Sequence, residues 1–135
     1  MKKLLESAKT IAVVGCSNNK MRTSYHIAKY IQEQGYRVIP VHPEYDEVLG
    51  EKVYPTVYDI PDDINIDIVD IFRNPEFTAN MVDDIIKRVE QTGRKPVVWT
   101  QLGVSSEEAK KKAENAGLKY VEEKCLMVEH QRLLG

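Results

Sequence analysis

The residues best suited to hold a charged ligand lie between Gly15 and Ser24, directly after an apolar run at residues 10–14. A glycine at the end of a buried strand lets the backbone turn tightly, and the following helix points its first N–H groups at whatever lies there. Ser17 and Ser24 would add hydroxyl donors, and Arg22 would pair with phosphate oxygens. The segment therefore predicts a phosphate-binding loop. The alternative is structural: the glycine only makes a turn, and a hydroxyl residue only caps the helix.

The same loop departs from the dinucleotide-binding fingerprint. That fingerprint requires G-x-G-x-x-G and an acidic residue at the end of the second strand. Here Gly15, Ser17 and Lys20 occupy the three glycine positions, and His42-Pro43 follows the second apolar run. Two glycines and the carboxylate are missing, which argues against an NAD site and favours a ligand rich in phosphate. An NAD(P)-binding protein or oxidoreductase with a degenerate fingerprint stays open as the alternative.

Candidate ligand-contacting residues also follow each of the other apolar runs. Together with Cys16 in the first loop they are His42, Pro43, Phe72, Arg73, Gln101, Gly103, Lys124 and Cys125. Because ligands of open parallel sheets bind beyond the carboxyl ends of the strands, we expect these residues to line one crevice.

No group of residues predicts a reaction. His26, His42 and His130 are the only histidines, and none has a carboxylate at a spacing that would orient it for catalysis. His26 is expected to be partly exposed on a helix, and His130 to be solvated in a polar terminal helix. Asp67 and Asp70 resemble a carboxylate pair, but residues three apart in a strand point to opposite faces. We predict no catalytic and no metal-binding residues.

These residues are carried by alternating strands and helices. Compact apolar runs predict five strands, at 10–15, 36–41, 66–72, 96–100 and 118–122. Helical spacing predicts helices at 24–34, at 75–92 with Asn74 as N-cap, at 105–116 with a Ser105–Glu108 capping box, and near the C-terminus. The proline-containing segment 42–65 is expected to cross the surface irregularly.

This alternation predicts one α/β domain covering residues 1–135, with a Rossmann-like, doubly wound, mostly parallel five-stranded sheet. With the strands numbered along the chain, we expect the order 3-2-1-4-5.

The bulk composition excludes several classes of partner. The 135 residues carry a formal charge of −2, which offers no basic surface for nucleic acid. No apolar run approaches the roughly 18 residues of a membrane span, and the first residues lack the apolar core of a secretion signal. Cys16 and Cys125 match neither a metal spacing nor a disulfide framework. We therefore expect a cytoplasmic protein with no membrane or nucleic-acid partner.

Several segments together resemble the family of small CoA-binding proteins, which is related to the CoA-binding domain of the succinyl-CoA synthetase α subunit. The resemblance extends from about residue 8 to the C-terminus. The segments that carry it are 11–17 (IAVVGCS), 22–25 (RTSY), 35–43 (GYRVIPVHP), 58–61 (YDIP), 69–73 (VDIFR), 98–103 (VWTQLG) and 123–125 (EKC). The chain departs from the family pattern at His42, often Asn, at Cys16, often Ala, and near Lys20, where a Pro is common.

The resemblance implies that coenzyme A or an acyl-CoA binds over the strand ends, without catalysis, in a carrier, sensor or partner module. It implies that Gly15, Ser17, Arg22 and Ser24 serve the phosphates and that Pro43 lies on the adenosine side. A protein partner or a homodimer is compatible with it. Because the ligand is a thiol, Cys125, beside Lys124 at a helix start, is a candidate for a mixed disulfide with it. The alternative is that Cys125 is a small buried apolar residue, as most free cysteines are.

Overall fold

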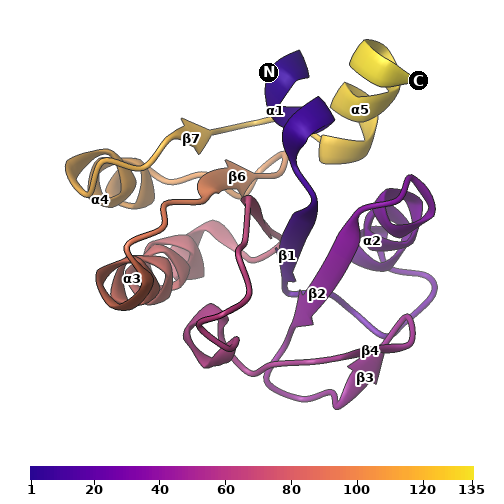
Figure 1. The fold of residues 1–135 in the computed structure, drawn as a ribbon, viewed down its shortest axis with the longest axis horizontal. Coiled ribbons are helices and arrows are strands. Elements are labelled where there is room, and N and C mark those ends of the chain that lie inside the picture. Colours follow the sequence, from indigo (N-terminus) through magenta and orange to yellow (C-terminus); the bar gives the residue numbers. More distant parts are fainter.

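The computed structural model describes all of residues 1–135 and contains a sheet of five parallel strands. In chain order the strands are β1 (Thr10–Val14), β2 (Arg37–Val41), β5 (Ile68–Ile71), β6 (Val97–Thr100) and β7 (Tyr120–Val121). The predicted α/β class is confirmed, and all pairings in this sheet are parallel. A separate two-stranded ribbon joins β3 (Glu47–Val48) to β4 (Glu51–Lys52) beside β2 (Figure 1).

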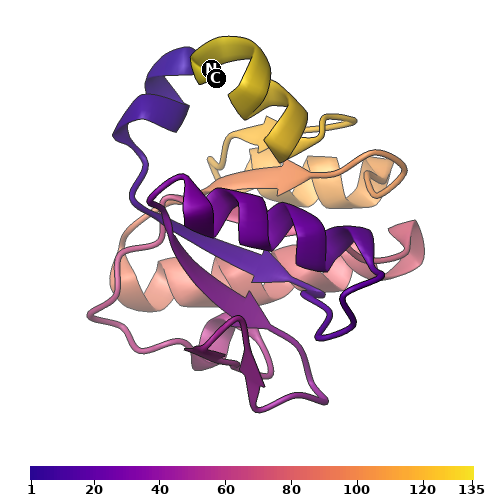
Figure 2. The same ribbon diagram turned by 90° about the vertical axis from the view of Figure 1, so that its right-hand side faces the viewer.

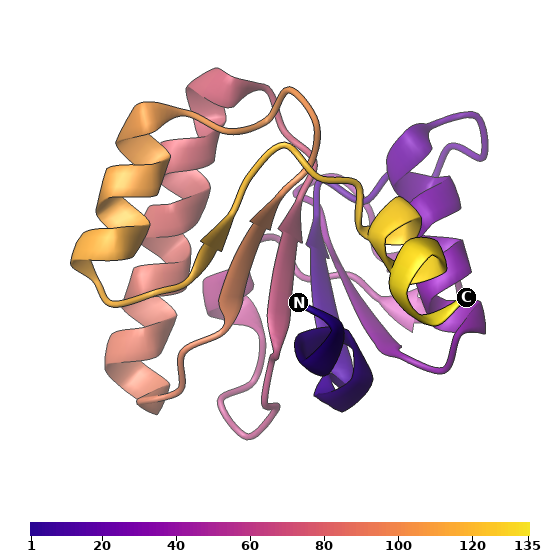
Figure 3. The ribbon, with the colours of Figure 1, turned by 90° about the horizontal axis from the view of Figure 1, so that it is seen from above.

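Helices cover both faces of the sheet, as Figure 3 shows. On one face lie α3 (Pro75–Thr92), α4 (Glu107–Asn115) and the short 3-10 helix η1 (Val57–Asp59). On the other lie α2 (Thr23–Glu33) and α5 (Leu126–Leu134), with α1 (Lys2–Ser7) packed against α5 (Figure 2). No helix has the length and apolar character needed to cross a membrane.

The observed strand order is β2-β1-β5-β6-β7, which corrects the expected 3-2-1-4-5 to 2-1-3-4-5 in chain numbering. The physical reason is burial. All four residues of β5 are buried, so both its faces must be covered, and this is the condition of a central strand. β2 begins at the exposed Arg37 and forms the edge instead. The switch point of the sheet therefore lies between β1 and β5, where α2 leaves toward one face and α3 toward the other.

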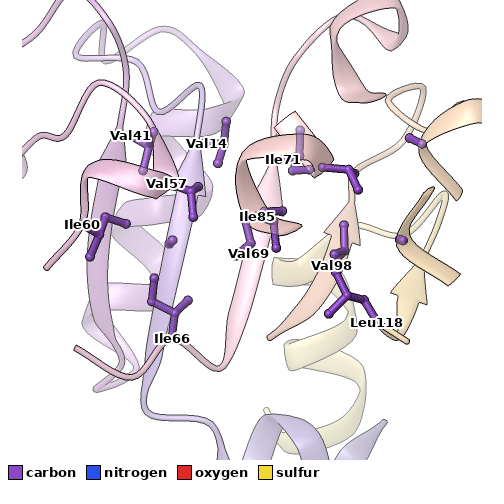
Figure 4. Close-up of a cluster of buried hydrophobic side chains, with 14 of the residues drawn as sticks. Val14, Val41, Val57, Ile60, Ile66, Val69, Ile71, Ile85, Val98 and Leu118 are labelled. Carbon is purple, nitrogen blue, oxygen red and sulfur yellow. The ribbon is translucent and has the colours of Figure 1, made fainter. Parts of the chain in front are cut away.

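Two apolar clusters hold these layers together. The cluster between the sheet and α3, α4 and η1 contains Val14, Val69, Ile85 and Val98, among others (Figure 4). The cluster on the opposite face surrounds Trp99, which is fully buried. Because the strands are apolar on both faces, their carboxyl ends are held rigidly at one edge of the sheet.

The helix starts differ from expectation at one place. The N-cap of α4 is Ser106, whose hydroxyl accepts a hydrogen bond from the Ala109 N–H, and not Ser105. The Ser105 hydroxyl instead bonds the Tyr120 hydroxyl and the Glu122 carboxylate. As predicted, Pro75 begins α3 after Asn74 and the left-handed Gly93 ends it. The segment 42–65 holds only the β3–β4 ribbon and η1, as expected for an irregular crossing.

Candidate functional site

Three adjoining cavities open along the carboxyl edge of the sheet. The β2-side cavity, about 190 Å³, is lined by Val14, Gly15, Val41, His42, Pro43, Pro55, Thr56, Val57, Arg73, Met81 and Asp84. The first-loop cavity, about 410 Å³, is lined by Gly15, Ser17, Arg22, Thr23, Ser24, His42, Tyr45, Phe72 and Arg73. The β6-side cavity, about 490 Å³, is lined by Thr23, Ile27, Phe72, Arg73, Asn74, Phe77, Gln101, Leu102, Val104 and Cys125.

The three cavities share walls and so form one groove. Gly15 and His42 line both the β2-side and the first-loop cavities, while Thr23 and Phe72 line both the first-loop and the β6-side cavities. Arg73 lines all three. Its guanidinium lies 4.9 Å from the centre of the Phe77 ring, which holds the cation at the middle of the groove. The groove lies over the switch point, where open α/β sheets bind ligands.

The loop between β1 and α2 is shaped by its own short polar side chains. The Ser17 N–H donates to the Ser24 hydroxyl at 3.0 Å, and the Asn19 N–H donates to the Ser17 hydroxyl at 3.0 Å. The Met21 N–H then donates to the Asn19 side-chain oxygen at 2.9 Å. These bonds fix the loop around the cavity before any ligand arrives, and the hydroxyl hydrogens of Ser17 and Ser24 remain available as donors.

The N-terminus of α2 has no side-chain cap. Its N-cap residue is Arg22, whose side chain makes no capping hydrogen bond. The structural alternative, a hydroxyl N-cap at this position, is therefore wrong. An uncapped helix start leaves its first N–H groups without protein acceptors and carries a partial positive charge. Together with Arg22 and Arg73 on the same cavity, it gives the first-loop cavity the positive charge and free N–H donors that suit an anion.

The β2-side cavity is mostly apolar, with two titratable side chains in its wall besides Arg73. His42 stacks on Tyr45 with ring centres 4.2 Å apart, and its Nδ1 accepts the Glu44 N–H at 3.1 Å. Burial and, to a smaller extent, Arg73 lower the pKa of His42 against the opposing effect of Glu44. A neutral His42 therefore presents its Nε2–H. Asp84 of α3 is the one carboxylate in this wall.

The β6-side cavity is walled by apolar side chains with an amide at its base. The Gln101 side-chain oxygen accepts the Leu126 N–H at 3.0 Å and so holds the start of α5 beside β6. The Trp99 indole N–H donates to the Lys124 carbonyl at 2.8 Å and anchors the preceding loop. These two bonds bring Cys125 back across the sheet to the groove. Phe77 and Leu102 form an exposed apolar rim.

Most of the residues predicted from the sequence lie on this groove. The residues that line it are Gly15, Ser17, Arg22, Ser24, His42, Pro43, Phe72, Arg73, Gln101 and Cys125. Cys16, Gly103 and Lys124 do not line it. Cys16 is turned into the apolar core, the Gly103 N–H is bound to the Glu123 carboxylate, and Lys124 contributes only its carbonyl, to Trp99.

Sequence reasoning missed the groove residues contributed by α3 and by the segment before η1, among them Asp84, Met81 and Thr56. No motif marked these residues, because they follow no strand. Arg88 positions this wall: its guanidinium donates to the carbonyls of Pro61 and Ile64 and so ties the segment after η1 to α3.

The two cysteines have different environments. Cys16 is fully buried, and burial together with the nearby Asp70 raises its pKa to about 12, which removes it from thiolate chemistry. Cys125 is partly exposed and lines the β6-side cavity.

His130 is buried, against the prediction of a solvated side chain. Its Nδ1 bonds the Tyr30 hydroxyl at 2.7 Å, in the contact between α2 and α5.

Asp70 is a buried carboxyl group without a hydrogen-bond partner. It lies in β5 between Val13 of β1 and Trp99 of β6, and neither of its carboxyl oxygens has a partner. Burial raises the pKa of Asp70 well above its ordinary value, so the fold favours the neutral form of this carboxyl group. Asp67, by contrast, accepts the Lys9 and Thr10 N–H groups at the other end of the sheet.

Protonation of Asp70 makes the stability of the fold depend on pH. The native state retains this proton above about pH 3.9, the ordinary aspartate pKa, where the unfolded state loses it. The free energy of unfolding therefore falls as pH rises through the window between the two pKa values. We expect Asp70→Asn to remove that slope. The free energy of unfolding of the variant minus that of the wild type should therefore be more positive at pH 8 than at pH 4. Urea unfolding at several pH values measures the free energy of unfolding of both proteins. Asp63→Asn, which neutralises an exposed carboxylate, should keep the wild-type slope; a wild-type slope in Asp70→Asn would contradict the interpretation.

Comparisons with known proteins agree with this geometry. A family model described as "CoA binding domain" matches residues 9–131. The uncharacterized protein YneT of Bacillus subtilis (strain 168) is 35% identical over 130 residues, which cover 96% of this chain and 91% of YneT. A structure of a hypothetical protein from Pyrococcus horikoshii OT3 is 46% identical, with a TM-score of 0.90, and the match covers 99% of this chain and 89% of that one.

The chain also matches a small part of a larger enzyme. An ADP-forming acetate–CoA ligase of Methanocaldococcus jannaschii is 30% identical over 95 residues, which are 70% of this chain and 12% of the ligase. The matched family region, 9–131, contains every residue that lines the groove. Because the family model matches nearly the whole length and the fold is an open parallel sheet, the chain belongs to the CoA-binding domain family.

Proposed function

We propose that the protein binds coenzyme A, free or acylated, along the groove and acts as a carrier, sensor or partner module without a reaction of its own. The observation that carries the proposal is the arrangement of three joined cavities with their cationic, phosphate-binding part in the middle. Coenzyme A has the same order: a nucleoside, a group of phosphates and a long pantetheine arm. A ligand with phosphates only at one end would leave part of the groove unused.

The direction of the ligand follows from the chemistry of the two outer cavities. The β2-side cavity is the smaller and more enclosed, and its apolar wall with Pro43 suits a flat nucleoside base. The β6-side cavity is larger and more open and offers Asn74 and Gln101 to the amides of a pantetheine arm. The thiol of that arm would then end near Cys125. A reducing cytoplasm would keep the thiol of coenzyme A and that of Cys125 free, which fits their proximity.

The absence of a reaction is proposed from the histidines. His42, the only histidine on the groove, has its Nδ1 occupied by a backbone N–H and not by a carboxylate, so no group orients it as a base. In the acetate–CoA ligase relative, the matching region is a minor part of a longer chain. That relation supports a module that holds coenzyme A and presents its thiol to a separate catalytic partner.

The ligand is tested by titration calorimetry. We expect coenzyme A to bind at least roughly tenfold more tightly than NAD⁺, NADH or NADP⁺, a difference of about 1.4 kcal/mol or more. The reason is that β2 is followed by His42 and Pro43, so the carboxylate that would hold the ribose hydroxyls of NAD is missing. Acetyl-CoA in the same titration shows whether an acyl group is accepted. Equal or tighter binding of NAD⁺ would assign the groove to a dinucleotide and reject the proposal.

A further inference from the structure

Asp84 is the one carboxylate in the most enclosed part of the groove. It lies on α3 and lines the β2-side cavity together with apolar side chains from four other segments. It is half-buried, and no hydrogen bond or ion pair of the structure involves its side chain. Its neighbour Asp83, in contrast, is bound to Lys112. A partly desolvated carboxylate without a partner costs free energy that a hydrogen-bond donor on a ligand would offset.

The charge of Asp84 decides which part of a nucleotide the β2-side cavity can take. Arg73 lines both this cavity and the first-loop cavity, but only the first-loop cavity also has Arg22 and no carboxylate. Phosphates are therefore favoured in the first-loop cavity, and Asp84 opposes a phosphate in the β2-side cavity. The remaining part is the base. Pro43, Val57 and Met81 give the cavity apolar walls for the faces of a bicyclic ring, and Asp84 meets its edge.

The purine bases differ at C6, on the edge that also carries N7. Adenine carries an amino group at C6, which donates, whereas guanine and hypoxanthine carry an oxygen there, which accepts. An ionised carboxylate can only accept. On the edge formed by N7 and C6 it therefore forms a hydrogen bond with adenine, whereas the same edge of a 6-oxopurine presents only acceptors, which the carboxylate repels. Thr56 cannot supply the missing donor without losing its own bond, since its hydroxyl donates to Asp59 at 2.9 Å.

We propose that Asp84 is the residue that selects adenine over 6-oxopurines, by accepting a hydrogen bond from the exocyclic amine in the β2-side cavity. The inference rests on the proposed function and extends it, because it assigns base recognition to a residue of α3 that no strand-end motif marks. The segment 55–57 completes the cavity opposite Asp84, and Arg88 anchors the chain just after it to the same helix. The Asp84 carboxylate and the apolar segment 55–57 are thus both held in place by α3.

The test compares two nucleotides that differ only at this atom. We expect calorimetry to show adenosine 3′,5′-bisphosphate binding the wild-type protein roughly 10–150-fold more tightly than inosine 3′,5′-bisphosphate, the range of a hydrogen bond to a charged group. Asp84→Asn should bring this ratio close to one, because a side-chain amide both donates and accepts. Asp84→Ala should also lose the preference. Glu90→Gln, which neutralises an exposed carboxylate of the same helix away from the cavities, should keep it.

Binding of coenzyme A in the same series distinguishes a failure of this inference from a failure of the proposed function. If coenzyme A binds but the wild-type protein does not distinguish the two bisphosphates, Asp84 does not select the base and only this inference is overturned. The same holds if folded Asp84→Asn and Asp84→Ala, checked by their unfolding midpoints, keep the full preference. If coenzyme A itself does not bind, the proposed function fails and this inference fails with it.

Discussion

Replacement of Gly15 by alanine is expected to destabilise the protein by about 2–5 kcal/mol and to weaken binding of coenzyme A by at least roughly tenfold. The backbone of Gly15 has a φ of +80°, which costs an L-residue roughly 1–2 kcal/mol. A β-carbon there would overlap the carbonyl oxygen of Phe72 and lie 3.3 Å from Cδ of Arg73. Such overpacking adds roughly 1–3 kcal/mol.

The overlap cannot be relieved cheaply. The Phe72 N–H donates to the Val14 carbonyl, and the Gly15 N–H donates to the Val41 carbonyl, so both sides of the contact belong to the sheet. Any movement that makes room shifts the first loop or Arg73, and both line the first-loop cavity. The affinity for coenzyme A therefore falls together with stability.

Gly50→Ala is the matched control for this experiment. Gly50 has a φ of +76°, nearly the same as Gly15, but a β-carbon there would meet no atom within 4 Å. Urea unfolding of the two variants separates the cost of the backbone conformation from the cost of the overlap. Equal destabilisation would show that the close approach of β1 and β5 contributes nothing, and undiminished binding in Gly15→Ala would exclude the first loop from the site.

Removal of the Arg22 side chain should act on binding alone. Arg22 is exposed, and its guanidinium has no partner in the protein. If it binds a phosphate, Arg22→Ala loses a charge-assisted hydrogen bond of about 1.5–3 kcal/mol, and the affinity for coenzyme A falls roughly 10–150-fold. Calorimetry measures the affinity, and the unfolding midpoint of the ligand-free protein should not change.

Two further variants sharpen the interpretation. Arg22→Lys keeps the charge but not the forked geometry and should recover only part of the lost affinity. Lys29→Ala removes an exposed cation of the same helix that lies outside the groove, and should leave binding unchanged. A large loss of stability with intact affinity in Arg22→Ala would make Arg22 a structural residue.

Features that depend on a few neighbouring residues were predictable from the sequence. The apolar runs located all five strands of the sheet, and Asn74, Pro75 and Gly93 located the ends of α3. The first loop was recognisable because a tight turn after a buried strand requires a glycine, and Gly15 supplies it. The rule that ligands bind beyond strand ends then found ten of the groove residues without knowledge of the strand order.

The order of the strands and the contribution of the helices to the groove depend on long-range packing and were visible only in the folded protein. Parallel strands present the same backbone hydrogen-bonding pattern to any partner, so the pattern of apolar residues does not state that β5 lies beside β1. That pairing brings Arg73 next to Gly15 and makes it common to all three cavities. Long-range packing also explains why Asp84 was not predicted as a groove residue. A helix side chain reaches the groove only through the packing of the whole helix against the sheet, and no local sequence motif predicts that packing. The same packing separated the cysteines, because the core turned Cys16 inward while Gln101 and Trp99 held the start of α5, and with it Cys125, at the groove.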